Sequence, residues 1–116
     1  MIGLPSGVRV LVATKPVDFR CGAERLAALA KATLKQDAYS GVVLVFRTKR
    51  SDRIKIVMWD GTGLVMIWKA LEGGFKWPPI SEGVMRLSSA QLAALVDGLD
   101  WTRIYAPRRV APRAAS

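Results

Sequence analysis

The residues whose types and spacing could do chemistry form a short basic cluster in the middle of the chain. The nine residues from Arg47 to Lys55 carry five positive charges and one acid, Asp52. Side chains of this kind contact phosphates and release counterions, and nearby Trp59 offers a surface for base stacking. Two alternatives stay open: a solvated loop whose charges only discourage strand addition, and a contact with a protein partner. The candidate DNA-contacting residues here are Arg47, Lys49, Arg50, Arg53 and Lys55, with Lys69 nearby.

Groups suited to catalysis are scarce. The chain has no histidine, which removes the commonest general base and metal ligand, and its one cysteine, Cys21, excludes an internal disulfide. The glycines in Gly61-Thr62-Gly63 join two strands and do not open a helix, so they form no phosphate-binding loop. We therefore expect no enzyme, no catalytic residue, no metal and no cofactor. Five aspartates could in principle converge on two metal ions, but most are better explained as caps, turns or helix ends: Asp18, Asp52, Asp60, Asp97 and Asp100.

Composition limits the class of protein. With 116 residues, of which 51% are hydrophobic, the chain is expected to form one domain, residues 1–105, with an ample core. The net charge of +9 and the isoelectric point of about 10.5 suit a polyanionic partner such as nucleic acid. No apolar run reaches the roughly 20 residues that cross a bilayer, and the first residues lack the pattern of a signal peptide. A reduced, cytoplasmic setting is expected.

Local patterns predict an α+β fold, an antiparallel β-meander of four to five strands with two helices packed on one face. The first helix is expected from Phe19 or Arg20 to Lys35, with Asp18 as its N-cap. The second helix follows Ser88-Ser89-Ala90-Gln91, which has the form of a capping box. Residues 106–116 are small, basic and proline-rich, and are expected to be a disordered tail. Strands are expected at Val8–Ala13, Val42–Arg47, Arg53–Trp59 and Leu64–Leu71, with a short fifth at Phe75–Trp77 and a last short extended piece at Val84–Leu87.

The turn after Trp59 decides which side chains share a face. A three-residue loop, Gly61–Gly63, pairs Asp60 with Leu64 and separates a dry face from a basic, aromatic one, whereas a two-residue loop mixes the two sets. We favour the three-residue loop because it segregates the charge. The dry face then carries Ile54, Ile56, Met58, Met66, Trp68 and Ala70, and the other face carries Arg53, Lys55, Val57, Trp59, Val65, Ile67 and Lys69.

The apolar members of that second face could instead dock a protein. This alternative makes the chain an adaptor that binds a partner without touching DNA, while its charge serves only solubility. An ordinary core beneath a helix would also explain these residues, because a sheet between two layers buries both faces. The candidate partner-binding residues are Val57, Trp59, Val65 and Ile67.

Several motifs resemble one known family over nearly the whole chain. They are the run from Trp59-Asp60-Gly61 through Gly63-Leu64, the segment Gly73 to Pro78 (GGFKWP), Asp18-Phe19-Arg20, and Leu99-Asp100-Trp101. This pattern is similar to the accessory proteins called TnpB of the IS66 class of bacterial insertion sequences, which are distinct from the RNA-guided nucleases of the same name. The sequence departs from the usual pattern by losing positive charge at Cys21, Ala70 and Gly74.

The resemblance implies a non-enzymatic accessory protein for DNA transposition, encoded beside the transposase that holds the catalytic acids. The expected partners are the transposase of the same element and DNA, with its terminal inverted repeats as candidate sites. The resemblance retains Arg20, which we add to the candidate DNA-contacting residues. In the adaptor alternative, the protein docks on the transposase through its apolar, tryptophan-bearing face.

Overall fold

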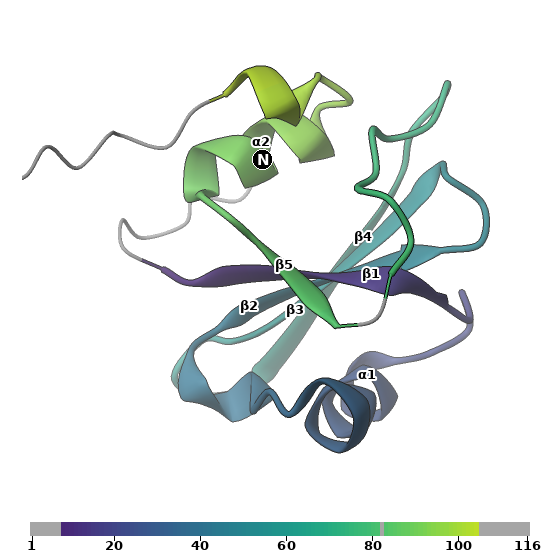
Figure 1. The fold of residues 1–116 in the computed structure, drawn as a ribbon. Coiled ribbons are helices and arrows are strands. Elements are labelled where there is room, and N and C mark those ends of the chain that lie inside the picture. The colour runs from purple at the N-terminus through teal and green to yellow at the C-terminus, as the bar shows by residue number, and fades with distance from the viewer. Residues whose placement is uncertain (1–7, 82, 105–116) are drawn as a thin grey trace, which may run out of the picture.

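A five-stranded sheet with the order β4-β3-β2-β1-β5 runs through the computed structural model, which describes residues 8–81 and 83–104 (Figure 1). The pair β1 and β2 is parallel, and every other neighbouring pair is antiparallel. The α+β class and the mostly antiparallel sheet are therefore confirmed. The strands are β1 (Val10–Val17), β2 (Val43–Thr48), β3 (Arg53–Trp59), β4 (Leu64–Ala70) and β5 (Val84–Leu87).

The predicted meander is correct for β2, β3 and β4 but wrong for β1. Val10 lies opposite Val43 in a parallel ladder, so the chain must cross a face of the sheet between these strands. Helix α1 (Ala23–Leu29), which continues as a π-helical segment over Ala30–Leu34, occupies this crossover. The parallel pairing thus fixes the position of α1 against the sheet.

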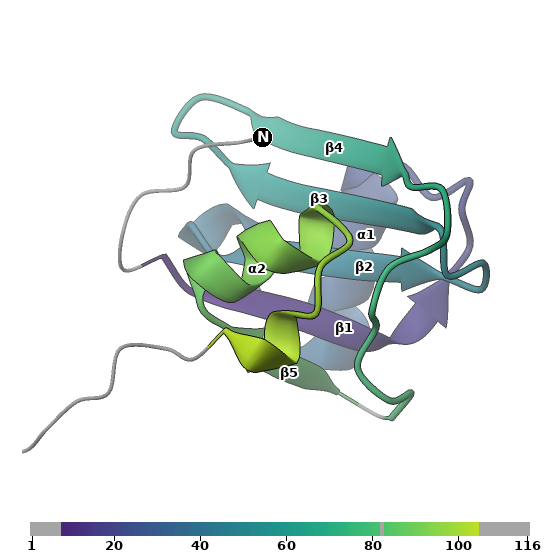
Figure 2. The ribbon, with the colours of Figure 1, turned by 90° about the horizontal axis from the view of Figure 1, so that it is seen from above.

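The two helices lie on opposite faces of the sheet, so the prediction that they share one face is wrong (Figures 1 and 2). Residues Leu11 and Leu44 pack in the α1 core, whereas Val10 and Val43 pack in the core beneath α2 (Ser89–Val96). Successive residues of a strand point to opposite faces. Because β1 and β2 are apolar at successive positions, both faces require a cover.

The ends of the helices follow local polar signals only in part. Helix α1 begins at Ala23 with Gly22 at its N-cap, and the Asp18 side chain instead accepts from the backbone N–H of Arg20, so the predicted cap is wrong. The predicted capping box of α2 is confirmed, with reciprocal bonds between Ser88 and Gln91. Gly98 and the residue after it donate to the carbonyls of residues 95 and 94, the pattern of a Schellman motif.

The turn between β3 and β4 has the register that we did not favour. Trp59 pairs with Leu64, and the backbone N–H of Asp60 donates to the carbonyl of Gly63. The carboxylate of Asp60 also accepts from the backbone N–H groups of Thr62 and Gly63, which fixes a tighter loop than predicted. The one-residue shift exchanges the faces of β4. Leu64, Met66, Trp68 and Ala70 share the face of Arg53, Lys55, Val57 and Trp59, and Val65, Ile67 and Lys69 share that of Ile54, Ile56 and Met58.

Residues 71–81, which follow β4, cross the α2 side of the sheet without regular structure. The predicted strand Phe75–Trp77 is wrong, because Phe75 donates its backbone N–H to the carbonyl of Ser51 and its side chain joins the α2 core. Short 3-10 helices occupy Ala38–Ser40 and Trp101–Arg103. The predicted tail, 106–116, lies outside the described residues. Within 8–81 and 83–104, no helix has the length and apolarity needed to cross a membrane.

Candidate nucleic-acid interface

The basic cluster divides into buried cations and exposed ones, and Lys55 is the clearest buried member. Its side chain is only 5% exposed, and its ammonium donates to the backbone carbonyls of Phe19 and Cys21, the latter at 2.6 Å. The same nitrogen lies 4.9 Å from the centre of the Phe19 ring. Lys55 therefore fastens the loop between β1 and α1 to the sheet, and it is not available to a phosphate.

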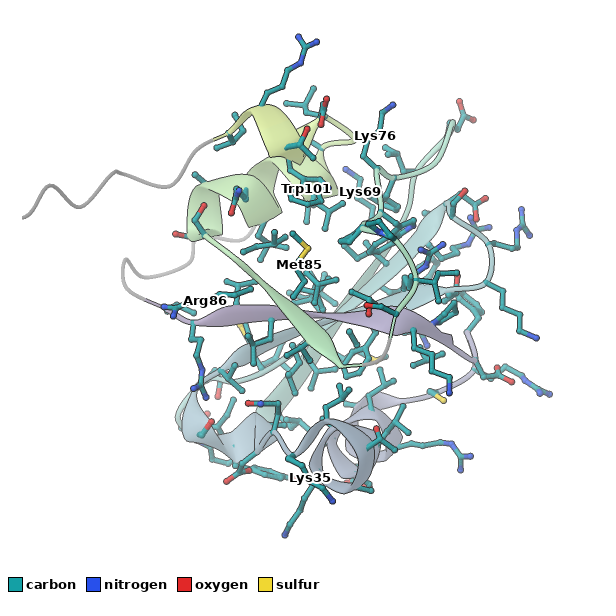
Figure 3. All side chains as sticks on the ribbon, viewed as in Figure 1. Lys35, Lys69, Lys76, Met85, Arg86 and Trp101 are labelled. Atoms are coloured by element: carbon teal, nitrogen blue, oxygen red, sulfur yellow. The ribbon has the colours of Figure 1, made fainter. Side chains whose placement is uncertain are left out.

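Two more of the predicted contacts have structural partners. The ammonium of Lys69 donates to the carbonyl of Val96 at 2.8 Å, so it caps the C-terminal end of α2 (Figure 3). The guanidinium of Arg47 lies 5.3 Å from the centre of the Trp77 ring, and burial lowers the pKa of this side chain. Its Nη1 makes a long hydrogen bond of 3.5 Å to the carbonyl of Pro78. Lys55, Lys69 and Arg47 are therefore each engaged with groups of the protein itself.

The exposed members gather at the turn between β2 and β3. Lys49 and Arg50 are exposed, whereas Arg53 is partly buried. Asp52 forms ion pairs of 3.1 Å with Arg50 and 2.7 Å with Arg53, so one acid offsets part of this charge. The backbone carbonyl of Ser51 accepts from Phe75 and from the indole of Trp77, and these bonds hold the turn in place. The turn therefore presents a fixed, net positive surface.

Arg20 lies on the neighbouring loop and is paired with an acid. Its guanidinium contacts both carboxylate oxygens of Asp18, at 3.2 and 3.1 Å. These hydrogen bonds, together with one from the Arg20 backbone, lower the pKa of Asp18 to about 2. Both side chains are exposed, so the pair keeps Arg20 oriented at the surface while cancelling its charge.

A hollow of about 610 Å³ opens between the β1–α1 loop, the β2–β3 turn and the end of β4. Two exposed aromatic rings stand in its wall: Phe19, 43% exposed, and Trp68, 53% exposed. Their centres are 5.7 Å apart and their planes are nearly perpendicular, at 89°. We call this feature the aromatic hollow, and it is lined by Pro16, Val17, Asp18, Phe19, Thr48, Lys49, Arg50, Arg53, Trp68 and Ala70.

Sequence reasoning missed both aromatic members of this hollow. The favoured three-residue loop puts Trp68 on the dry face, whereas the two-residue loop, which shifts the register by one residue, puts it beside Lys55, as the structure shows. The helix predicted from Phe19 or Arg20 begins only at Ala23, so Phe19 lies in the loop before α1. Trp59, the predicted stacking surface, instead packs against Tyr39, with ring centres 5.5 Å apart.

The four candidate partner-binding residues do not form one surface. Val57 is fully buried in the α1 core, and Trp59 lies on the same face. Val65 and Ile67 lie on the opposite face, where Ile67 packs against the α2 core. The adaptor alternative requires these four residues on one open face of the sheet, but they are divided between its two faces.

The aspartates serve turns and helix ends. Asp60 accepts from the backbone N–H groups of Thr62 and Gly63, and Asp100 accepts from the hydroxyl and then the backbone N–H of Thr102; these hydrogen bonds lower the pKa of both carboxyls. Asp97 forms the C-cap of α2. Over residues 8–81 and 83–104, no group of three or more His, Cys, Asp or Glu side chains could hold a metal ion. Cys21 is buried among the residues that pack beneath α1.

Comparison with known proteins gives matches over most of the chain. The family model described as IS66 Orf2 like protein matches residues 8–106. The chain is 47% identical over 105 residues to the uncharacterized protein y4jC of Sinorhizobium fredii (strain NBRC 101917 / NGR234), which covers 90% of each chain. It is also 40% identical over 101 residues to the uncharacterized protein y4hO of the same strain, covering 84% of this chain and 88% of that one. No solved structure matches.

Proposed function

Because the chain belongs to the family of IS66 Orf2-like proteins, and is therefore an accessory protein of insertion-sequence transposition, we propose that it contacts DNA directly at the β2–β3 turn. The contacting residues in this proposal are Lys49, Arg50 and Arg53, with Arg20 at the margin. The protein acts without catalysis, in the cytoplasm, beside the transposase of the same element.

One observation carries the proposal: exposed cations of the cluster line the same hollow as two exposed aromatic rings. Lysine and arginine neutralise phosphates, and aromatic faces stack on bases, so this combination suits nucleic acid better than it suits a solvated loop. The net charge of +9 adds a long-range attraction that brings a polyanion to the surface.

The adaptor alternative has less support from the geometry. Both faces of the sheet carry a helix, and the proposed docking residues are divided between them. A contact with the transposase remains part of the proposal because the family acts in transposition. In the described part of the chain, both apolar faces of the sheet pack against helices, so neither offers the open docking face that the adaptor alternative requires.

Binding to labelled DNA, measured by fluorescence anisotropy at several salt concentrations, tests the proposal. The probe carries a terminal inverted repeat of the element, both as a duplex and as a separate strand, with scrambled sequences as controls. Lys49→Gln combined with Arg50→Gln should weaken binding and reduce the slope of log K against log salt by about 2 for a duplex, since each phosphate contact contributes about 0.9.

A matched variant separates local contact from net charge. Arg9→Gln combined with Lys31→Gln also removes one arginine and one lysine, both exposed and neither lining the aromatic hollow. Equal weakening by the two double variants would mean that net charge, and not the β2–β3 turn, holds the DNA. Failure of the wild-type protein to bind either form of DNA at low salt would refute direct contact altogether.

A further inference from the structure

Trp68 differs from the other three tryptophans in having its ring open to solvent. The indoles of Trp77 and Trp101 donate to the backbone carbonyls of Ser51 and Lys76, and Trp101 is buried. Trp59 packs on a tyrosine. Trp68 is 53% exposed, although burial of so large an apolar side chain would stabilise the fold. An exposed tryptophan in a basic hollow is therefore a candidate for ligand contact.

The neighbours of Trp68 hold its ring without covering it. Phe19 meets Trp68 at 89°, and Phe19 is itself fixed by the ammonium of Lys55 and by the guanidinium of Arg53, 5.9 Å from its ring centre. The ring of Phe19 thus already makes cation–π contacts with two side chains of the protein. Among the described residues, no cation lies over the ring of Trp68 in the same way. The hollow consequently offers one braced aromatic platform, Trp68.

We infer that the aromatic hollow binds an unpaired nucleotide of DNA, with its base stacked on Trp68 and its phosphates at Lys49 and Arg50. This inference rests on the proposed function and adds the form of DNA that the site takes. The faces of bases in a duplex are covered by their neighbours, so an indole can stack only on a base that is single-stranded or displaced from the helix. A concave site of about 610 Å³ also lies in the range of pockets that enclose small ligands, and a nucleotide is of that kind.

The test compares a single strand with the duplex of the same sequence, using the full chain and the variant Trp68→Ala. Single-strand binding should weaken about tenfold, within the roughly 5- to 150-fold range that removal of one stacked base implies, and duplex binding should change by less than about twofold. Trp68→Phe, which keeps an aromatic face, should retain most of the affinity. Binding of the single strand should also quench tryptophan fluorescence in the wild type, and Trp68→Phe should abolish most of the quenching.

Tyr39→Ala is the matched control, because Tyr39 is equally exposed, at 54%, and does not line the aromatic hollow. Circular dichroism and thermal unfolding of each variant verify the fold, and the quenching measurement with Trp68→Phe does not depend on the alanine variant folding.

The possible outcomes separate this inference from the proposed function. If strand and duplex bind equally well and Trp68→Ala affects neither, the stacking site is wrong, although direct DNA contact stands. If Tyr39→Ala weakens single-strand binding as much as Trp68→Ala does, the aromatic hollow is not the stacking site. If neither form of DNA binds, both proposals fail.

Discussion

Replacing Lys55 with methionine should destabilise the protein and also loosen Phe19 in the wall of the aromatic hollow. Methionine keeps an unbranched apolar stem up to the ε position but removes the ammonium that joins β3 to the β1–α1 loop. The carbonyls of Phe19 and Cys21 then lose their shared donor. The Phe19 ring also loses the cation 4.9 Å from its centre.

The magnitude follows from the contacts. Two hydrogen bonds from a charged donor contribute about 3 to 6 kcal/mol in total, and the cost of burying the ammonium, which methionine avoids, offsets part of this. We expect Lys55→Met to lower the free energy of unfolding by about 2 kcal/mol, which in a domain of this size lowers Tm by about 8 to 16 °C. Thermal unfolding followed by circular dichroism, supported by urea titration, measures the change.

Lys69→Met is the control for this experiment. Its ammonium makes one hydrogen bond, to the carbonyl of Val96, and lies nearer to solvent, so the expected loss is about 1 kcal/mol. A loss of about 1 kcal/mol would already lower Tm by about 4 °C or more. If Tm of Lys55→Met lies within about 2 °C of wild type, Lys55 does not stabilise the attachment of the β1–α1 loop to the sheet. The same conclusion would follow if Lys69→Met proved the more destabilising change.

Three further outcomes follow from the described contacts. Ser88→Ala removes the capping box of α2 and should cost about 1 kcal/mol, measured by urea unfolding. Gly98→Ala should lower Tm, because Gly98 has φ +75° and an added Cβ would lie 2.6 Å from Cδ2 of Leu71; an unchanged Tm would contradict the strain argument. The carboxyl of Asp18 should titrate near pH 2 by NMR and return toward 3.8 in Arg20→Gln. Because its pKa is lower in the folded protein than in the unfolded one, its contribution to stability is present above about pH 4 and is lost as pH falls toward 2.

Local signals in the sequence were sufficient for most individual elements. Alternating or β-branched runs predicted β2, β3, β4 and β5, and Ser88 with Gln91 predicted the start of α2. These features depend on residues close in the chain. The choice of parallel pairing for β1 depends instead on which face α1 covers. Strands that are apolar on both sides leave that choice open.

The register of the β3–β4 turn shows how a small error changes a predicted site. Favouring the loop that segregated charge put Trp68 on the wrong face, whereas the carboxylate of Asp60, which accepts from Thr62 and Gly63, favours the tighter loop. The correct register brings a tryptophan to the cations and divides the predicted docking residues between two faces. A one-residue error in the register of β4 was thus enough for the prediction to miss the aromatic part of the site.

The positions of the Lys55 and Lys69 ammonium groups were beyond local inference, because they depend on carbonyl groups far along the chain. Lys55 donates to residues 36 and 34 positions away, and Lys69 donates to a residue 27 positions away. A count of charges between Arg47 and Lys55 therefore overstates the surface available to phosphate. Part of that charge holds the fold together instead.

The two tasks of the basic cluster are connected, and this changes how its variants must be interpreted. Lys55 fixes the loop that carries Phe19, and Phe19 in turn braces Trp68, so loss of a buried cation alters the aromatic hollow without removing a phosphate contact. Weaker DNA binding by a Lys55 variant is consequently ambiguous. Lys49 is exposed, and no ion pair of the described chain involves it, so loss of its charge should change salt dependence with little effect on Tm. Of these residues, Lys49 gives the most direct measure of whether the turn touches phosphate.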